Sequence, residues 1–281
     1  MLSGFEVLFF LLCGFFGWIL ARATIHRLTW GRYEADRAAP SLQDYLISAL
    51  REACAEIRVV VAYAFGWLPY TMPAFDVRGG PPILLVHGFA MNRSCWMSMT
   101  RRLRARGYTN VYAINLKPLF GSISTMSERL THDIRDFSSH CGGRHVITIG
   151  HSMGGLVIAH ARRIQQDLPI CATITIGSPY NGTLLARLTI VSCGREMIRG
   201  SSFLEHAKPH DSTISIYSRM DTVVIPSKSS VIDPSHELTH CNHNTMLFSK
   251  PAFRLLLAEI QCVVKAASQP SFNQKTPETI S

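Results

Sequence analysis

The residues best suited to covalent chemistry lie in the sequence G-H-S-M-G at residues 150–154, where glycines flank Ser152 at two-residue spacing. A serine hydroxyl becomes a strong nucleophile only when a nearby base takes its proton. Residues 146–149 are apolar and β-branched, which predicts a buried strand, and residues 156–166 predict a helix. A sharp turn from strand to helix holds such a hydroxyl where a base can reach it. The pattern therefore indicates nucleophilic catalysis by Ser152.

Asp221 is the carboxylate best placed to orient the base. In proteins with a G-x-S-x-G turn the acid follows the serine along the chain, and the histidine follows the acid. Residues 213–217 predict a strand, and Asp221 comes after a short turn at its carboxyl end. Asp211 precedes this strand and so lies at the wrong end, whereas Asp233 comes later. We predict Asp221 as the acid, with Asp233 as the alternative.

Three histidines compete for the role of base: His236, His240 and His243. The base is expected on a loop just before the final helix, and His243 lies closest to residues 246–248, which lead into that helix. We predict His243, with His240 and then His236 as alternatives. The three histidines also suggest a metal site, but Glu237 alone does not complete a recognised ligand pattern. We expect neither a metal nor a cofactor here.

Two backbone N–H groups are candidates for binding the oxyanion that develops when a serine attacks a carbonyl. One belongs to Met153, directly after the nucleophile, and the other to Phe89, in the loop after a strand predicted at residues 83–86. Gly88 permits close approach of this loop. His87 is expected to support the loop structurally, and a role as a second base is the alternative.

These residues need a scaffold in which strand ends converge. Strands and helices alternate from about residue 75, with strands at residues 83–86, 110–115, 146–149, 170–176 and 213–217 and helices at residues 93–106, 125–139, 156–166 and 246–266. Such alternation predicts a mostly parallel sheet with helices on both faces, and sites in such sheets gather at the carboxyl ends of the strands. Residues 184–209 break the rhythm and are either a lid over the site or a pair of surface helices.

The N-terminal segment, residues 1–28, contains an apolar run at residues 5–20, slightly short of the ~20 residues needed to span a bilayer. Arginines follow it at positions 22, 27, 32 and 37, and Arg22 could extend its side chain to a membrane interface. We expect a membrane anchor with the catalytic domain on the cytoplasmic side. A signal-like segment of a secreted or periplasmic protein, and a buried or lipid-surface helix, are the alternatives.

The remaining chain divides into three regions. Residues 29–74 form a helical linker region, whose helix at residues 41–63 is capped by Ser41 with Asp44 and carries apolar residues at positions 42, 46, 50, 53, 57 and 60 on one face. Residues 75–267 form the expected catalytic domain. The polar residues 268–281 are expected to be a flexible tail.

Composition narrows the class of partner. The chain has 281 residues, a net charge of +9 and no Lys/Arg block interleaved with aromatic residues, so a nucleic-acid partner is not expected. Arginines at positions 101, 102, 104 and 106 lie on one predicted helix, as either a solvated face or a surface attracted to anionic lipid. None of the eight cysteines forms C-x-x-C, and their redox state is left open.

Three motifs together resemble the α/β-hydrolase superfamily, and within it bacterial triacylglycerol lipases and esterases. They are P-I-L-L-V-H-G-F at residues 82–89, G-H-S-M-G-G at residues 150–155 and I-G-S-P-Y-N-G-T at residues 176–183, in which Tyr180 replaces the usual histidine. Residues 199–204, 217–224 and 243–248 match the same pattern in order. The likeness covers about residues 80–265 and leaves out the N-terminal anchor and its helix.

The resemblance implies the α/β-hydrolase fold and a serine hydrolase that cleaves carboxylic esters. The expected anchor, the basic surface and the apolar segment at residues 184–209 favour lipid esters and a membrane surface as partners. Because this fold hosts many reactions, an acyltransferase, a thioesterase or peptidase, and a non-catalytic membrane-tethered binding protein are the alternatives.

Overall fold

A parallel sheet forms the centre of the molecule. The computed structural model describes residues 4–267, with side chains described from residue 13 onward; the predicted tail at residues 268–281 lies outside them. Within that range the strands form one six-stranded sheet in the order β2-β1-β3-β4-β5-β6, and every neighbouring pair is parallel. The strands are β1 (Ile83–Val86), β2 (Val111–Ala113), β3 (Val146–His151), β4 (Ile170–Ile176), β5 (Thr213–Ser218) and β6 (Ser235–Leu238).

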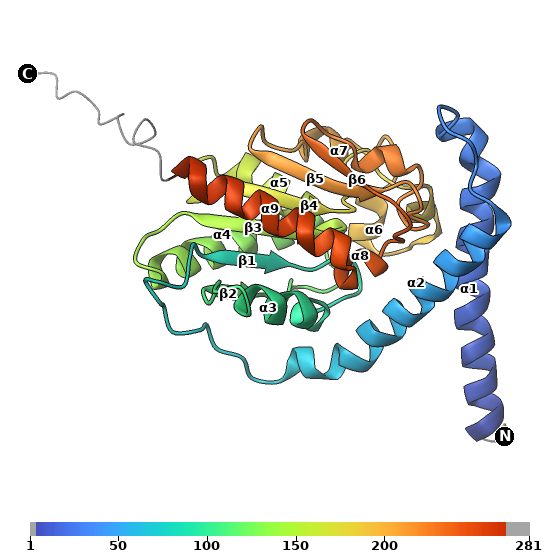
Figure 1. Cartoon of the computed structure of the whole chain (residues 1–281), viewed down its shortest axis with the longest axis horizontal. Helices are drawn as coiled ribbons and strands as arrows, with labels where there is room; N and C mark the ends of the chain where they lie inside the picture. The colour runs from blue at the N-terminus through green and yellow to red at the C-terminus, as the bar shows by residue number, and fades with distance from the viewer. Residues whose placement is uncertain (1–3, 268–281) are drawn as a thin grey trace, which may run out of the picture.

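Helices cover both faces of this sheet, as the alternating pattern predicts (Figure 1). One face packs against α4 (Ile123–His140) and α5 (Met153–Ile164), and the other against η2 (Arg93–Trp96), α3 (Met97–Arg104) and α9 (Lys250–Ala267). The side chains of β1 show the two-sided burial, since Leu84 contributes to the first core and Leu85 to the second. A strand buried on both faces has a continuous apolar sequence, which is why β1 could be predicted from the sequence.

Two elements differ from the sequence-based expectation. The predicted helix at residues 246–266 is divided into α8 (Thr245–Phe248) and α9, because Ser249 between them is extended and Pro251 can begin but not continue a helix. The edge strand β6 has no counterpart among the predicted strands. Its sequence, S-H-E-L, is only partly buried and carries no apolar run or clear alternation.

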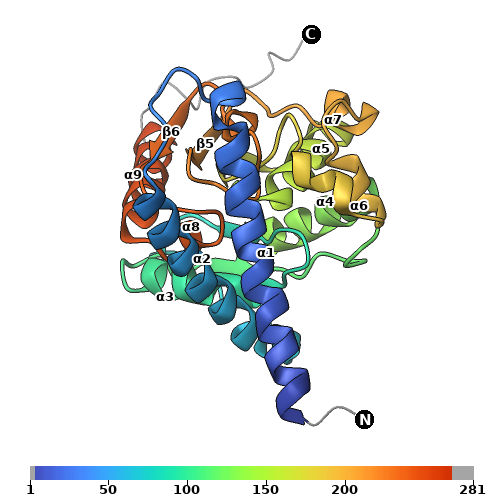
Figure 2. The same ribbon diagram turned by 90° about the vertical axis from the view of Figure 1, so that its right-hand side faces the viewer.

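Two N-terminal helices lie across the carboxyl ends of the strands. Helix α1 (Gly4–Tyr33) and helix α2 (Leu42–Tyr63) pack together, and a 3₁₀ turn, η1 (Ala64–Trp67), follows α2. Figure 1 shows β1 pointing toward α8 and α2, and Figure 2 shows α1 running across this end of the molecule. The predicted cap of α2 is confirmed, because Ser41 Oγ accepts the Asp44 N–H at 3.1 Å while Asp44 accepts the Ser41 N–H at 3.0 Å.

The apolar face predicted for α2 is mostly exposed. Leu42, Leu46, Leu50, Ile57 and Val60 face solvent, whereas Ala53 is buried. The inner face instead carries small and polar residues, namely Tyr45, Ser48, Ala49, Glu52, Ala53, Ala55 and Val59. The alanines allow α1 to approach closely, and the polar side chains bond to loops of the hydrolase body.

The expected transmembrane anchor is not supported. No helix within the described residues is long and apolar enough to cross a membrane. Arg22, which was expected to reach a membrane interface, is instead buried and forms an ion pair with Glu56 of α2.

Residues 184–209 fold as three short helical pieces: η3 (Leu184–Leu188), α6 (Ser192–Glu196) and α7 (Ser202–His206). Cys193, Met197 and Leu204 anchor the segment in the core beside α4 and α5, while Leu188 and Ile190 are exposed.

All eight cysteines are free thiols.

Candidate active site

Ser152 occupies a strained turn between β3 and α5. Its backbone has φ 53° and ψ −126°, a region that L-residues other than glycine rarely adopt and that costs about 1–3 kcal/mol. The Ser152 N–H donates to Ile176 O at 2.9 Å, which fixes the turn against the end of β4. The predicted strand, turn and helix around the serine are therefore confirmed.

The glycines around Ser152 are required by close backbone contacts. A Cβ at Gly150 would lie 2.6 Å from Gly155 N, and a Cβ at Gly154 would lie 2.4 Å from Val86 O. Atoms this close cannot coexist without movement of the backbone. The spacing of the motif thus allows α5 to pack directly on β1 and β3.

Asp221 and His243 form a buried hydrogen-bonded pair. Asp221 follows β5 and His243 precedes α8, and the His243 Nδ1–H donates to Asp221 Oδ2 at 2.7 Å. The other carboxylate oxygen accepts the N–H groups of Val223 and Val224, each at 2.8 Å. With its proton on Nδ1, the ring leaves Nε2 as a lone-pair acceptor, and Nε2 has no hydrogen-bond partner within residues 13–267.

The surroundings favour protonation of His243. Burial lowers the pKa of His243, but the charge of Asp221 and its hydrogen bond outweigh burial, so the pKa lies above its ordinary value of 6.5. His151 packs beside it with ring centroids 4.7 Å apart, and burial holds the pKa of His151 well below 6.5. The neighbouring ring is therefore neutral and adds little positive charge.

The serine and the Asp–His pair adjoin one another through Gly177. This residue follows Ile176, which bonds Ser152, and a Cβ on it would lie 3.3 Å from both Asp221 Oδ2 and His243 Nδ1. Between the described side chains there is no hydrogen bond from Ser152 Oγ to His243. In enzymes without bound substrate such catalytic bonds are often long and tighten only in the complex.

The rival acids and bases lie elsewhere. His236 lies on β6 and bonds Glu259 at 2.7 Å, and His240 is exposed with φ 56°. Asp211 is exposed just before β5, and Asp233 is exposed before β6. Among the candidate acids and bases, Asp221 and His243 are the only two that the described structure joins to each other by a hydrogen bond.

The loop after β1 lies directly against the nucleophile. A Cβ on Gly88 would lie 2.9 Å from Ser152 Cβ. His87 Nε2 accepts the Leu116 N–H at 2.9 Å and its Nδ1–H donates to Gly88 O at 2.9 Å, while burial lowers the pKa of His87 to about 4. These bonds confirm that neutral His87 supports the loop. Phe89 follows Gly88, so its N–H remains our candidate for an oxyanion donor together with that of Met153.

Glu52, on the inner face of α2, supports the histidine loop. Its fully buried carboxylate accepts the Asn244 N–H at 2.8 Å, the Thr245 N–H at 2.9 Å and the Thr245 hydroxyl at 2.9 Å. These groups come directly after His243, at the start of α8. Burial raises the pKa of Glu52, and the bond from the Asn244 N–H opposes that rise.

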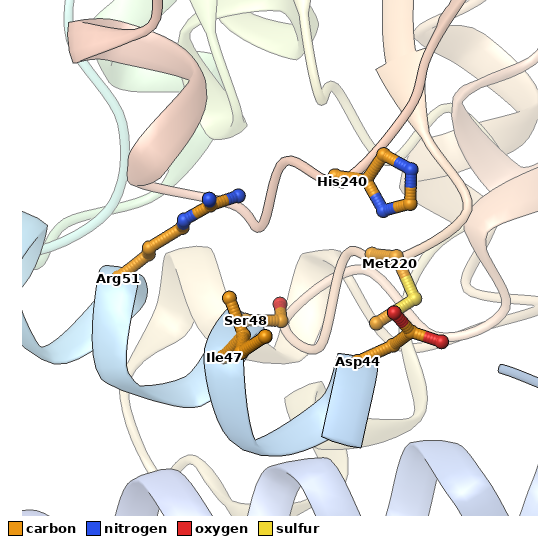
Figure 3. Close-up of a pocket in the computed structure, with 6 residues that line it drawn as sticks. All are labelled: Asp44, Ile47, Ser48, Arg51, Met220 and His240. Carbon is orange, nitrogen blue, oxygen red and sulfur yellow. The ribbon is translucent and has the colours of Figure 1, made fainter. Parts of the chain in front are cut away.

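A second contact of α2 reaches the same loop through Asn242. Its amide Nδ2 donates to Ser48 Oγ at 3.2 Å, while its Oδ1 accepts the N–H groups of His243 at 2.8 Å and Thr222 at 3.0 Å. Asn242 thus connects the acid loop, the base and α2. Figure 3 shows Ser48 and Asp44 of α2 opposite Met220 and His240, around a pocket of about 200 Å³.

Helix α1 holds the acid loop from the other side. Glu34, buried directly after this helix, bonds Arg219 at 3.0 Å and accepts a hydrogen bond from the Ser227 hydroxyl at 2.6 Å. Arg219 also bonds Asp36 and Glu237, and lies two residues before Asp221. No motif in the sequence marks these supporting residues. Their one local signal is a pair of polar residues, Ser48 and Glu52, one turn apart on a helix whose opposite face is apolar.

The family described as "Alpha/beta hydrolase family" matches residues 83–253. A comparison with curated proteins found no match.

Among solved structures, lipase B of Aspergillus fumigatus is similar with a TM-score of 0.61 and 18% identity over 69% of this chain; the match spans 59% of the fungal chain. The mature lipase BlEst2 of Bacillus licheniformis has a TM-score of 0.57 and 17% identity, over 68% of this chain and 96% of the lipase chain. Phospholipase PlaB of Legionella pneumophila has a TM-score of 0.51 and 12% identity, over 71% of this chain and 66% of the phospholipase chain. At these identities the likeness concerns the fold.

Proposed function

The chain belongs to the α/β hydrolase family, and we propose that it is a serine hydrolase that cleaves carboxylic esters through Ser152, His243 and Asp221. The observation that carries the proposal is the arrangement at the ends of β3 and β5. A strained serine adjoins a histidine whose Nδ1–H is bonded to a buried carboxylate at 2.7 Å and whose Nε2 is without a partner in the described chain. That arrangement fits a nucleophile, a base and an orienting acid.

In the proposed first step Ser152 Oγ attacks the acyl carbon while its proton passes to His243 Nε2. Asp221 holds the imidazole in the required tautomer and stabilises the imidazolium through the bond to Nδ1. The tetrahedral intermediate collapses, and the leaving alkoxide takes the proton from Nε2. Water then attacks the acyl-enzyme and gives a proton to Nε2, after which Ser152 leaves as the hydroxyl and the acid is released.

The oxyanion of each intermediate needs fixed donors. The N–H of Met153 begins helix α5, where the first N–H groups have no partner within the helix. The N–H of Phe89 follows Gly88, which lies against Ser152. We assign both N–H groups to the oxyanion, a contribution that in hydrolases is worth about 2.7–4 kcal/mol per donor.

Lipid esters are the substrates we propose. The solved structures of similar fold include proteins named as lipases and a phospholipase. Residues 184–209 expose Leu188 and Ile190, which suits a lid that meets an apolar substrate. A location of the catalytic domain at the cytoplasmic face of a membrane is a further proposal, based on the chain's net charge of +9, because the cytoplasmic leaflet carries the anionic lipids.

Hydrolysis of p-nitrophenyl esters of increasing acyl length, with covalent labelling by a fluorophosphonate, tests the function. Ser152→Ala should abolish both turnover and label while the melting temperature stays close to that of the wild type. Ser139→Ala, which changes an exposed serine of α4, is the matched control and should behave as wild type. Absence of label from the folded wild-type protein at neutral pH would reject the proposal.

A further inference from the structure

The outward face of α2 is apolar although nothing in the described chain covers it. Leu50 and Val61 are 64% and 67% exposed, and Leu46, Ile47 and Ile57 lie on the same face at helical spacing. A helix on the surface of a globular protein normally shows the opposite pattern, with its apolar side facing the core and its polar side facing water. Here the inward positions are taken by the polar groups that hold the catalytic loops.

The apolar face continues past the helix into a basic groove. Phe65 and Leu68, each 56% exposed, extend the same side of α2 and line a groove of about 940 Å³ between η1, α3 and α8. Met97 and Tyr70 complete its apolar rim. Apolar and basic surfaces are therefore continuous.

Five arginines line this groove and no carboxylate does: Arg58, Arg93, Arg101, Arg102 and Arg104. None of the five forms a salt bridge within residues 13–267. Four of them contact neutral groups only. Arg102 donates to Phe248 O and Ser249 O, and Arg104 donates to Val111 O at 3.5 Å. Arg93 stacks 4.7 Å from the Tyr70 ring, and Arg58 lies 5.7 Å from the Phe248 ring. Uncompensated guanidinium groups with free donors are suited to phosphate.

We propose that the outer face of α2, η1 and the arginine groove together form a surface that docks on an anionic phospholipid bilayer. The apolar side chains enter the boundary between headgroups and acyl chains, and the arginines contact lipid phosphates. The chain's net charge of +9 favours the same partner. A second copy of the chain fits less well, because a self-complementary interface would set the five arginines against one another.

The docking surface is coupled to the proposed ester hydrolysis by α2 itself. The outer face of the helix would contact lipid while Ser48 and Glu52 on its inner face hold the loop of His243. The two faces are one helix diameter, about 10 Å, apart. This places the catalytic centre close to the bilayer, where lipid esters are found, and in this respect the inference rests on the proposed function.

Co-sedimentation of the full chain with vesicles tests the surface. Phosphatidylcholine vesicles with added phosphatidylglycerol should bind the wild type far more strongly than phosphatidylcholine alone. Arg101→Gln with Arg104→Gln should reduce binding to the anionic vesicles about 30-fold, from the effect of two basic residues at such a surface. Arg129→Gln with Arg163→Gln, which removes the same charge from α4 and α5, should bind like the wild type.

The apolar face is tested separately. Leu50→Ser with Ile57→Ser should weaken binding to both kinds of vesicle, whereas Val77→Ser with Ile164→Ser, exposed residues elsewhere, should not. All four variants should hydrolyse a soluble short-chain ester as the wild type does, so failure of docking is distinguishable from failure of catalysis. Equal binding by the groove variant and its control would overturn the proposal, as would a concentration-dependent dimer that the Leu50/Ile57 variant abolishes.

Discussion

Replacing Glu52 with alanine would remove the acceptor for three donors that follow His243: the N–H groups of Asn244 and Thr245 and the Thr245 hydroxyl. A buried donor left unpaired costs about 1–3 kcal/mol. The loss is partly offset because a fully buried carboxylate, whose pKa is raised by burial, no longer has to be accommodated. We therefore expect a net loss of about 2–4 kcal/mol in the free energy of unfolding, seen as a fall in melting temperature of about 4–16 °C.

The same change should reach catalysis through the position of His243. The loop would lose its attachment to α2, and a displacement of a catalytic group by about 1 Å can cost about 100-fold in rate. We expect kcat/KM for a soluble short-chain ester to fall by about that factor, mainly in kcat. Glu52→Gln, which keeps one acceptor oxygen, should recover part of the loss.

The assay measures thermal melting curves and steady-state kinetics of ester hydrolysis on the same preparations of the wild type and the Glu52 variants. Leu50→Ala, on the opposite face of α2, is the control and should leave hydrolysis of the soluble ester unchanged. If Glu52→Ala lowers the melting temperature but keeps kcat/KM within about twofold of the wild type at a temperature where both are folded, α2 does not position the base and the reasoning is refuted.

Three further outcomes follow from the site. Because a general base must be neutral and the charge of Asp221 raises the pKa of His243 above 6.5, kcat/KM should fall as pH drops through a value above 6.5; a pH profile flat down to pH 6 would contradict this. Gly154→Ala would place a methyl group 2.4 Å from Val86 O, so we expect a loss of at least about 3 kcal/mol in stability together with lost labelling of the serine, measured by denaturant unfolding. Arg219→Met leaves the buried carboxylate of Glu34, directly after α1, without its charged partner, and should lower stability by about 3–5 kcal/mol in the same unfolding experiment; an unchanged midpoint would show that the contact contributes nothing.

The sequence predicts the centre of the fold because each strand there is marked locally. β1 is a continuous apolar run and β3 begins with four β-branched residues, while the positions of Asp221 and His243 follow from the order of strands and of the final helix. Chemistry at the ends of parallel strands is constrained by topology. The choice of His243 over His240 therefore needed only the position of the last helix.

The parts that sequence did not predict depend on contacts between distant segments. β6 is a short polar edge strand, identified by its pairing with β5 and not by its own composition. The polar positions of α2 could not be assigned a role from the sequence, because their partner loop lies 192 residues further along the chain. Local periodicity gives the apolar face of a helix but not which side the rest of the protein covers.

The separation between α2 and the histidine loop also bears on when activity arises during synthesis. The Asn244 N–H and Glu52 are 192 residues apart, and Ser227 and Glu34 are 193 apart. The two helices are synthesised well before the loops that they hold, so these contacts close only after the sheet between them exists. Contacts of such long range form slowly because chain entropy is lost before they are gained. The inner polar groups of helices α1 and α2 therefore stay unpaired until the loops more than 190 residues further along the chain have been made, and the base is fixed in place only after the sheet has formed.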